Sequence, residues 1–323
     1  MKEGPKGWLP PELRSRHERA MTYEFHEQIR TFSEVGRTIE NPPERCIWAE
    51  LEQKHLGRLL PRNFQQTGSC VGAGGFVAAC KSQLGDRLHR QDNELLTPFF
   101  PWSVYGHSRK LAGMRRRGSG SFGSAFAKAI DDSGDGIGVL PYDDPRFPQP
   151  QIIDGNWWKY TEQQELEWSY SPQFPVDVET LKSEGQKFGM QSITRLSNAN
   201  DVVQLTAQGH GITLASMYGS RSMRNKGRAG QRILVASWNA RWPHQMSVGG
   251  YWTHPEFGLM ILIDNQWSKR AHPQCETLAE FGSNGSFWIP ENDFNRICRD
   301  GEVYAFSDGG FEEERTNLWD NLW

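Results

Sequence analysis

One cysteine of this chain stands in a backbone setting that favours a nucleophile. Cys70 follows the tight turn of Gly68 and Ser69, and it precedes a run rich in small residues, 72–79, that can begin a helix. A thiol at a helix N-terminus lies near the positive end of the backbone dipole, which favours the thiolate. Because the thiolate is the nucleophilic form of cysteine, we expect Cys70 to be a reactive group.

A cysteine nucleophile needs a base, and the base needs a group that orients it. Of the nine histidines, His244 begins a strand-like stretch, 244–251, and a second such stretch, 259–264, is followed by Asn265. A hairpin of these two strands would bring the Asn265 amide beside His244, where it could accept the imidazole proton. Trp267 could then shield that hydrogen bond from water.

The wider pattern predicts the elements that would position these side chains. The first half of the chain has helix-like patterns at 12–33, 70–84, 102–111 and 121–132. The second half has strand-like stretches separated by turn signals, at 212–218, 231–237, 245–252, 259–264, 286–289 and 303–306. Helices followed by antiparallel strands predict an α+β fold with two lobes. The segment 145–185, rich in Pro, Trp and Gln, is interpreted as an insertion.

The chain resembles the papain-like cysteine peptidases in the order and spacing of these motifs. The Gly-Ser-Cys motif of that family matches 68–70, and its histidine strand, with Gly-Tyr six and seven places after the histidine, matches 244–251. Its Asn-Ser-Trp motif matches 265–267, with glutamine in place of serine. The glycine-rich substrate wall of the family is matched by Gly118, Ser119, Gly120 and Ser121, and its following Pro-Tyr by Pro141 and Tyr142. The resemblance covers roughly residues 46–306.

The resemblance implies a papain-like fold with a helical N-terminal lobe, an antiparallel sheet or barrel in the C-terminal lobe, and a cleft between them. It divides the chain into an extension at 1–45, a peptidase domain at 46–310 and an acidic, aromatic tail at 311–323. The two lobes would span about 46–200 and 201–310. The extension lacks the helical inhibitory pattern of a long family propeptide, but it could still cover the cleft.

The resemblance also implies hydrolysis of a peptide or protein substrate without a metal or cofactor. Cys70 would attack the peptide carbonyl, and His244 would protonate the leaving amine and then activate water. Asn265 would orient the imidazole. The adjacent Asp264 is an alternative orienting group, although the spacing fits Asn265 better.

The expected oxyanion donor is the point at which the chain departs from the family. The family has a glutamine six residues before the cysteine, and this chain has Phe64 there, followed by Gln65 and Gln66. Either Gln65 or Gln66 supplies the amide, or that donor is missing. Loss of one oxyanion donor typically lowers the rate on the order of a hundredfold or more.

Two other functions are consistent with this departure. The chain could be a catalytically weak or inactive papain-like subunit of a larger assembly, such as a phage virion. It could also be a related thiol enzyme, such as a peptidoglycan amidase or a transglutaminase-like protein. The long spacing from Cys70 to His244 and the Asn-x-Trp motif favour the papain-like order.

Composition limits the setting in which the protein acts. The formal net charge of −3 argues against nucleic acid and anionic membranes as partners. No apolar run is long enough to span a membrane, and the N-terminus lacks the apolar core of a signal peptide. Five cysteines without CxxC pairing predict neither a disulfide framework nor a zinc site. We therefore expect a reducing, cytoplasmic setting, and Thr67 agrees, because secreted family members carry a disulfide cysteine at that position.

Three surface features stand outside the expected site. The arginines at 115–117 and the basic stretch 221–232 are interpreted as solvated loops. In the tail, two leucines and two tryptophans are each spaced by four, so one helical turn would place them on one side. These residues, which we expect to pack on their own domain or on a protein partner, are Leu318, Trp319, Leu322 and Trp323.

Overall fold

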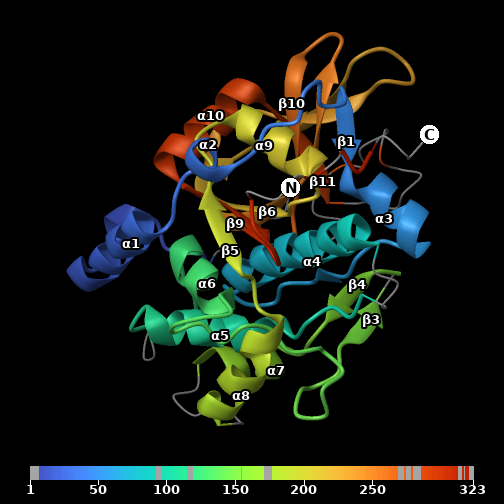
Figure 1. The fold of residues 1–323 in the computed structure, drawn as a ribbon. Helices are drawn as coiled ribbons and strands as arrows, with labels where there is room; N and C mark the ends of the chain where they lie inside the picture. Colours follow the sequence, from blue (N-terminus) through green and yellow to red (C-terminus); the bar gives the residue numbers. More distant parts are fainter. Residues whose placement is uncertain are drawn as a thin grey trace.

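The computed structural model describes residues 7–91, 96–114, 119–153, 155–170, 177–267, 273, 278, 285–311, 315 and 317–319. The chain combines helices with a large, mostly antiparallel sheet, as the α+β prediction requires. Figure 1 shows helix α4 crossing the middle of the molecule, with the large sheet on one side and helices α5 to α8 on the other. The predicted α+β architecture is confirmed.

Helix α4 (Cys70–Arg90) is the central element of the core. Most of its residues are buried, because one face packs on strand β9 and another on helices α5 (Pro101–Leu111) and α6 (Gly123–Ile130). Its glycines allow these contacts: a Cβ at Gly74 would lie 3.0 Å from the Gln245 carbonyl oxygen, and one at Gly75 would overlap the Phe126 ring. The helix runs six residues beyond the predicted end at residue 84.

The large sheet has the strand order β5-β12-β6-β9-β10-β11-β8-β7, and β1 pairs with β9 outside this path. Its pairs are antiparallel except β11 with β8. The expected hairpin forms between β9 and β10, with Ser247 opposite Asp264. The strands are β1 (Arg45–Ile47), β5 (Ser192–Arg195), β6 (Ile212–Gly219), β7 (Met223–Lys226), β8 (Ile233–Ala236), β9 (Ala240–His254), β10 (Gly258–Asp264), β11 (Ser286–Pro290) and β12 (Glu302–Ser307).

Helices α9 and α10 also pack on this sheet. Helix α9 (Ala199–Ala207) begins at a capping box in which the side chains of Asn198 and Asp201 bind each other's backbone amides. Helix α10 (Glu291–Asp300) buries Phe294, Ile297 and Cys298 and leaves its polar residues outward. The β1 strand leads into helix α3 (Trp48–Leu56) beside the same sheet, so segments from both halves of the chain build this layer.

The segment 145–185 is structured. It contributes β3 (Gln151–Ile153) and β4 (Trp157–Lys159), which form a small sheet with β2 (Arg62–Asn63), and the helices α7 (Glu162–Tyr170) and α8 (Val178–Gly185). A short 3-10 helix, η2 (Gln186–Phe188), follows. Because β4 pairs with β2, this segment lies directly beside the loop that leads to Cys70.

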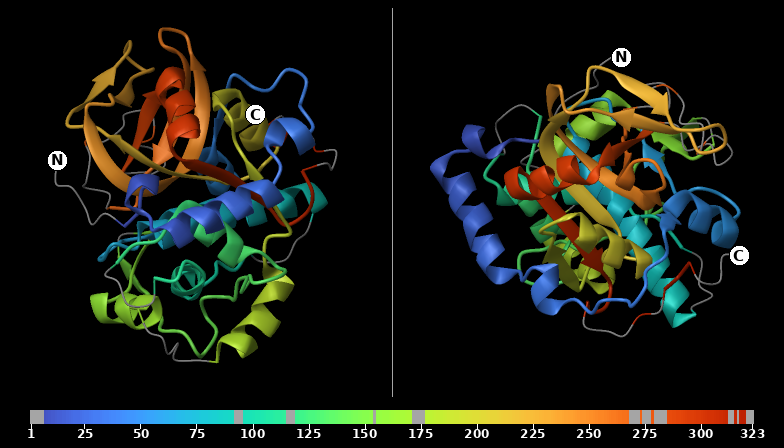
Figure 2. Two further views of the ribbon diagram at one scale, coloured as in Figure 1. Left: turned by 90° about the vertical axis from the view of Figure 1, so that its left-hand side faces the viewer. Right: turned by 90° about the horizontal axis from the view of Figure 1, so that it is seen from above.

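The N-terminal extension is anchored to the domain. It consists of a 3-10 turn η1 (Pro11–Leu13), helix α1 (Arg16–Gln28) and helix α2 (Phe32–Val35). The capping box of Ser15 and Glu18 starts α1, which packs on α6; Figure 2 shows this dark-blue helix lying across the domain. The predicted helix at 12–33 is therefore shorter and is broken at Ile29.

Part of the tail packs on its own domain. Trp319 is buried with its ring 5.5 Å from the ring of Trp48, and Arg315 forms a buried ion pair with Asp86. Leu322 and Trp323 lie outside the described residues. Among the described residues, no helix has the length and apolar character that crossing a membrane requires.

Candidate active site

The thiol of Cys70 lies at the start of α4, against the strand that carries the expected base. Cys70 is completely buried, and its Sγ accepts a hydrogen bond from the backbone amide of Gln245 at 3.4 Å. Gln245 directly follows His244 on β9. The close packing of α4 on β9 at Gly74 therefore places the candidate nucleophile against the backbone of the residue that follows the candidate base.

The imidazole of His244 is held by the residue that the sequence predicts. Its Nε2 lies 2.9 Å from Asn265 Oδ1, and both side chains are buried. The β9–β10 hairpin makes this contact, because Asn265 follows the last residue of β10. The ring of Trp267 lies 4.6 Å from the imidazole ring and covers it. The structure thus brings His244, Asn265 and Trp267 together, and it places Cys70 against the backbone of the residue that follows His244.

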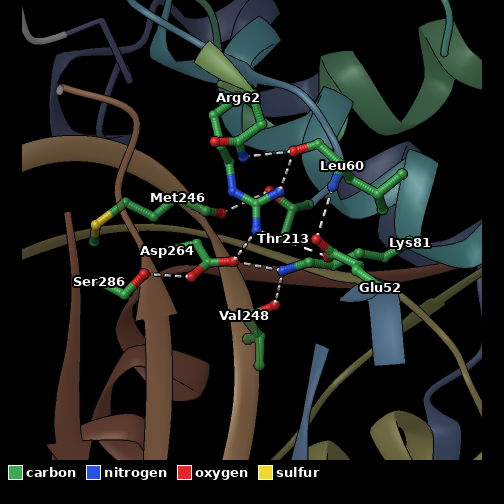
Figure 3. A network of polar contacts seen from close by, with 10 residues as sticks. Glu52, Leu60, Arg62, Lys81, Thr213, Met246, Val248, Asp264 and Ser286 are labelled. Atoms are coloured by element: carbon green, nitrogen blue, oxygen red, sulfur yellow. Dashed lines mark hydrogen bonds and ion pairs between the residues drawn. The ribbon is translucent and has the colours of Figure 1, made fainter. Parts of the chain in front are cut away.

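The alternative orienting group, Asp264, faces away from this cluster. Its carboxylate lies 2.7 Å from Lys81 Nζ and 3.1 Å from Arg62 Nη2, and it accepts a hydrogen bond from Ser286. Figure 3 shows this buried network, which also includes Glu52 at 3.7 Å from Arg62. Burial by itself would raise the pKa of Asp264, but the two cations outweigh it and hold the pKa at about 2. Asp264 therefore links β10 to α4 and β2 through ion pairs and does not orient His244.

The two candidate oxyanion residues have different environments. Gln66 Nε2 donates to the Tyr160 carbonyl, on the small-sheet side. Gln65 is buried, and its Nε2 donates 2.8 Å to the carbonyl of Thr67, within the loop that leads to Cys70. Phe64 is bound through its backbone amide to Trp158. Of the two glutamines, Gln65 is the one whose side-chain amide binds within the loop before Cys70, which we call the nucleophile loop.

A carboxylate that the sequence did not single out organises the same loop. Glu165 of α7 is buried and accepts hydrogen bonds from the backbone amide of Gln66 at 3.2 Å and from the amide and hydroxyl of Thr67 at 3.2 and 2.9 Å. It also accepts from the Ser69 hydroxyl at 3.0 Å. Burial raises the pKa of Glu165 to about 7, although the hydrogen bonds from these donors lower it. The loop before Cys70 is therefore tied to the segment interpreted from sequence as an insertion.

The N-terminal extension covers the thiol. The Leu9 amide donates to the Ser121 carbonyl and the Ser121 amide to the Gly7 carbonyl, both at 2.8 Å, so Trp8 forms a parallel bridge with Ser121. The backbone amides of Gly7 and Trp8 lie close enough to the Cys70 thiol to lower its pKa. A Cβ at Gly7 would lie 1.7 Å from the Gly68 carbonyl oxygen, so only glycine fits there.

The segment that covers the thiol, residues 7–9, runs beside the loop that is expected to form the substrate wall. Ser121 and the buried Gly120 form the wall beside the extension, and Tyr105 links it to the nucleophile loop by hydrogen bonds to the Gly120 amide and the Gly68 carbonyl. Ser119 is exposed, and Gly118 lies outside the described residues. Of the residues predicted to form the wall, Ser121 binds an extended backbone in this structure, and that backbone belongs to the chain itself.

The burial of the thiol disfavours its ionised form. Burial raises the pKa of Cys70 to about 12, although the amides of Gln245, Gly7, Trp8 and Val71 partly offset that rise. The sulfur faces N–H groups here and is held as a hydrogen-bond acceptor. Within the described residues, no group of three or more His, Cys, Asp or Glu side chains could hold a metal ion.

Comparison with solved structures identifies the fold. Xylellain, a cysteine protease from Xylella fastidiosa, superposes with a TM-score of 0.55 at 15% identity, over 96% of this chain and 99% of xylellain. Digestive procathepsin L 3 of the Tenebrio molitor larval midgut superposes with a TM-score of 0.50 at 12% identity, over 94% of this chain and 83% of that chain. No protein-family model and no curated protein matches the sequence. The chain therefore has the papain-like fold predicted from its motifs.

Proposed function

We propose that this papain-like chain is a cysteine peptidase whose thiol is covered by its own N-terminal extension. The observation that carries the proposal is the hydrogen bond between His244 Nε2 and Asn265 Oδ1 at 2.9 Å, beside a cysteine at a helix N-terminus. A base oriented by an amide and placed next to a thiol is the arrangement that nucleophilic catalysis requires.

The residues act in two half-reactions. With the extension displaced, His244 takes the Cys70 proton, and the thiolate attacks a peptide carbonyl to form a tetrahedral intermediate. The Cys70 amide and the Gln65 side chain are the proposed oxyanion donors. His244 then protonates the leaving amine, and water activated by the same imidazole hydrolyses the thioester. Asn265 keeps the ring in place, and Trp267 excludes water from its hydrogen bond.

The wall residues Gly120 and Ser121 are proposed to bind the substrate backbone. Ser121 already binds the backbone of Gly7 and Leu9, through a bridge that any extended peptide can form. Gly118 and Ser119 belong to the same proposed wall. The substrate is a peptide or protein, and a cytoplasmic, reducing setting remains a prediction.

A second candidate function is that of an inactive papain-like subunit in a larger assembly, such as a virion. The complete burial of Cys70 and the phenylalanine at position 64 favour it. Under this alternative, the extension is a permanent part of the fold. Leu318, Trp319, Leu322 and Trp323 remain the proposed partner contact, although Trp319 is buried within its own domain in this structure.

A peptide probe with an electrophilic warhead separates the two functions. Gly7→Val cannot fit against Gly68, so it displaces the extension in the full-length chain. Faster deuterium exchange at the Leu9 amide reports that displacement. We expect the probe to label Cys70 in Gly7→Val much faster than in the native chain, with Gly7→Val/Cys70→Ala as the control. If Leu9 exchanges freely and Cys70 still stays unlabelled, the peptidase proposal is wrong.

A further inference from the structure

One buried hydroxyl joins the nucleophile loop to the substrate wall. Tyr105 of α5 is completely buried, and its Oη donates to the Gly68 carbonyl at 2.9 Å and accepts from the Gly120 amide at 3.0 Å. A phenol has one proton, so it serves both groups only by donating to one and accepting from the other. Gly68 lies two residues before Cys70. Gly120 directly precedes Ser121, whose backbone binds the extension. This one oxygen therefore sets the separation between the nucleophile loop and the wall.

Helix α5 holds the wall through two further side chains, three and four positions after Tyr105 and thus on the same face of the helix. Ser108 Oγ lies 3.0 Å from Ser121 Oγ, and Arg109 Nη1 donates to the Gly120 carbonyl at 2.6 Å. Both side chains are buried. Gly120 has a φ of +127°, a conformation that favours glycine. Its amide and its carbonyl are therefore both bound by side chains of α5.

The nucleophile helix fixes the position of Tyr105 in turn. A Cβ at Gly72 of α4 would lie 2.8 Å from the Tyr105 Cβ, so glycine permits this close approach of the two helices. The Arg109 guanidinium carbon lies 5.9 Å from the centre of the Tyr105 ring. Burial raises the pKa of Tyr105 to about 12, so at neutral pH the hydroxyl keeps the proton that it donates to Gly68.

We propose that Tyr105 is a positioning residue, which holds the wall at the distance from Cys70 that an extended peptide needs to present its carbonyl to the thiol. The inference rests on the proposed peptidase function and adds the group that couples binding of the substrate backbone to attack. A misplacement of about 1 Å can lower a rate on the order of a hundredfold, so the loss of this link should slow peptide hydrolysis. A reagent too small to reach the wall does not need the link.

The test compares a long substrate with a small reagent in the full-length Gly7→Val background. Tyr105→Phe removes one oxygen and keeps the ring. We expect kcat/KM for a fluorogenic hexapeptide to fall by about 10- to 100-fold. The rate at which iodoacetamide alkylates Cys70 should change by less than about threefold, because this rate depends on the thiol and its access.

Tyr251→Phe is the matched control. The Tyr251 hydroxyl also donates to a backbone carbonyl, that of Pro43 at 2.8 Å, and accepts from a second group, Cys46 Sγ at 3.3 Å. It lies beside β1, seven residues beyond His244 on β9. Both substitutions should lower the free energy of unfolding, whereas Tyr251→Phe should leave both rates within about twofold. An unchanged peptide rate in Tyr105→Phe, or equal falls in the peptide and iodoacetamide rates, would overturn the positioning role.

A second measurement needs no catalysis, because in the native chain the wall binds the extension. The Leu9 amide donates to the Ser121 carbonyl, so Tyr105→Phe should speed deuterium exchange at Leu9 by about tenfold, and Tyr251→Phe should not. Unchanged exchange at Leu9 would overturn the claim that Tyr105 holds the wall. Faster exchange in Tyr105→Phe, together with a Cys70 that the electrophilic probe fails to label in Gly7→Val, would instead overturn the peptidase proposal and support the link between Tyr105 and the wall.

Discussion

Lys81 Nζ lies 2.7 Å from Asp264 Oδ2, and this buried ion pair joins the helix of the nucleophile to the strand of the orienting amide. Lys81 lies on α4, which begins at Cys70, and Asp264 directly precedes Asn265. Arg62 Nη2 lies 3.1 Å from the same carboxylate (Figure 3). Arg62 belongs to β2, so this ion pair also links the strand that leads to the loop before Cys70. The two ion pairs therefore fix helix α4, strand β10 and strand β2 relative to one another.

Removal of one member of this pair should destabilise the chain strongly. Lys81→Met leaves the Asp264 carboxylate buried beside a single cation, and loss of one partner of a buried pair costs about 3–5 kcal/mol. Chemical denaturation should show this loss in the free energy of unfolding. Lys128→Met is the matched control, because the Lys128–Asp135 pair is largely exposed and should contribute at most about 1 kcal/mol. Equal effects of the two substitutions would contradict the role given to Asp264.

Asn265 should affect catalysis more than stability. In the Gly7→Val background, Asn265→Ala removes the acceptor of the His244 hydrogen bond, so the imidazole loses its orientation. We expect kcat to fall about 10- to 100-fold with KM little changed. Asn265→Asp restores an acceptor and should recover part of that loss. A fall confined to KM would show that Asn265 acts on substrate binding instead.

Glu165 should position the nucleophile loop. Glu165→Ala removes the acceptor for four hydrogen bonds from residues 66, 67 and 69. We expect kcat/KM of the displaced chain to fall by about tenfold or more. Thr67→Val, which removes one of these donors, should have a smaller effect in the same assay. If both substitutions leave the rate unchanged, the loop is held by other contacts.

Glu165 also predicts a dependence of stability on pH. Its pKa is raised in the folded chain from 4.5 to about 7, so the folded state holds this proton more tightly than the unfolded state. The resulting stabilisation is fully present below about pH 4.5 and is lost as the pH rises through about 7. The Tm of the native chain should therefore fall relative to the Tm of Glu165→Gln as the pH rises from 5 to 8. A difference that does not vary with pH would contradict a neutral Glu165.

The sequence could predict the residues whose spacing is characteristic. Cys70 was predicted from its place after a Gly-Ser turn at the start of a helix. The contact of His244 with Asn265 was predicted because a hairpin has a fixed geometry, so the distance along the chain translates into proximity. Trp267 followed from the same hairpin. Most strands of the large sheet were predicted because they are apolar and bounded by turn residues. The short strands β1, β5 and β7 were not predicted.

The parts that escaped prediction depend on contacts between distant polar segments. Glu165 lies 96 residues from Ser69, in a segment with few apolar residues, so no local pattern indicated that it binds the nucleophile loop. The cover could be anticipated only as a general role of the extension, because the fit of Gly7 against Gly68 depends on tertiary packing. Neither Gln65 nor Gln66 could be chosen from sequence, since both directly follow Phe64.

The proposed peptidase activity requires that Cys70 form a covalent intermediate once the extension is displaced. The most direct measurement is the intact mass of full-length Gly7→Val, quenched in acid within milliseconds of mixing with a peptide ester. We predict one acyl group per chain, located on Cys70 by peptide mapping, lost with time and absent from Gly7→Val/Cys70→Ala. Ester turnover without an acylated Cys70, or no acyl group in a chain whose Leu9 amide exchanges freely, would contradict the account.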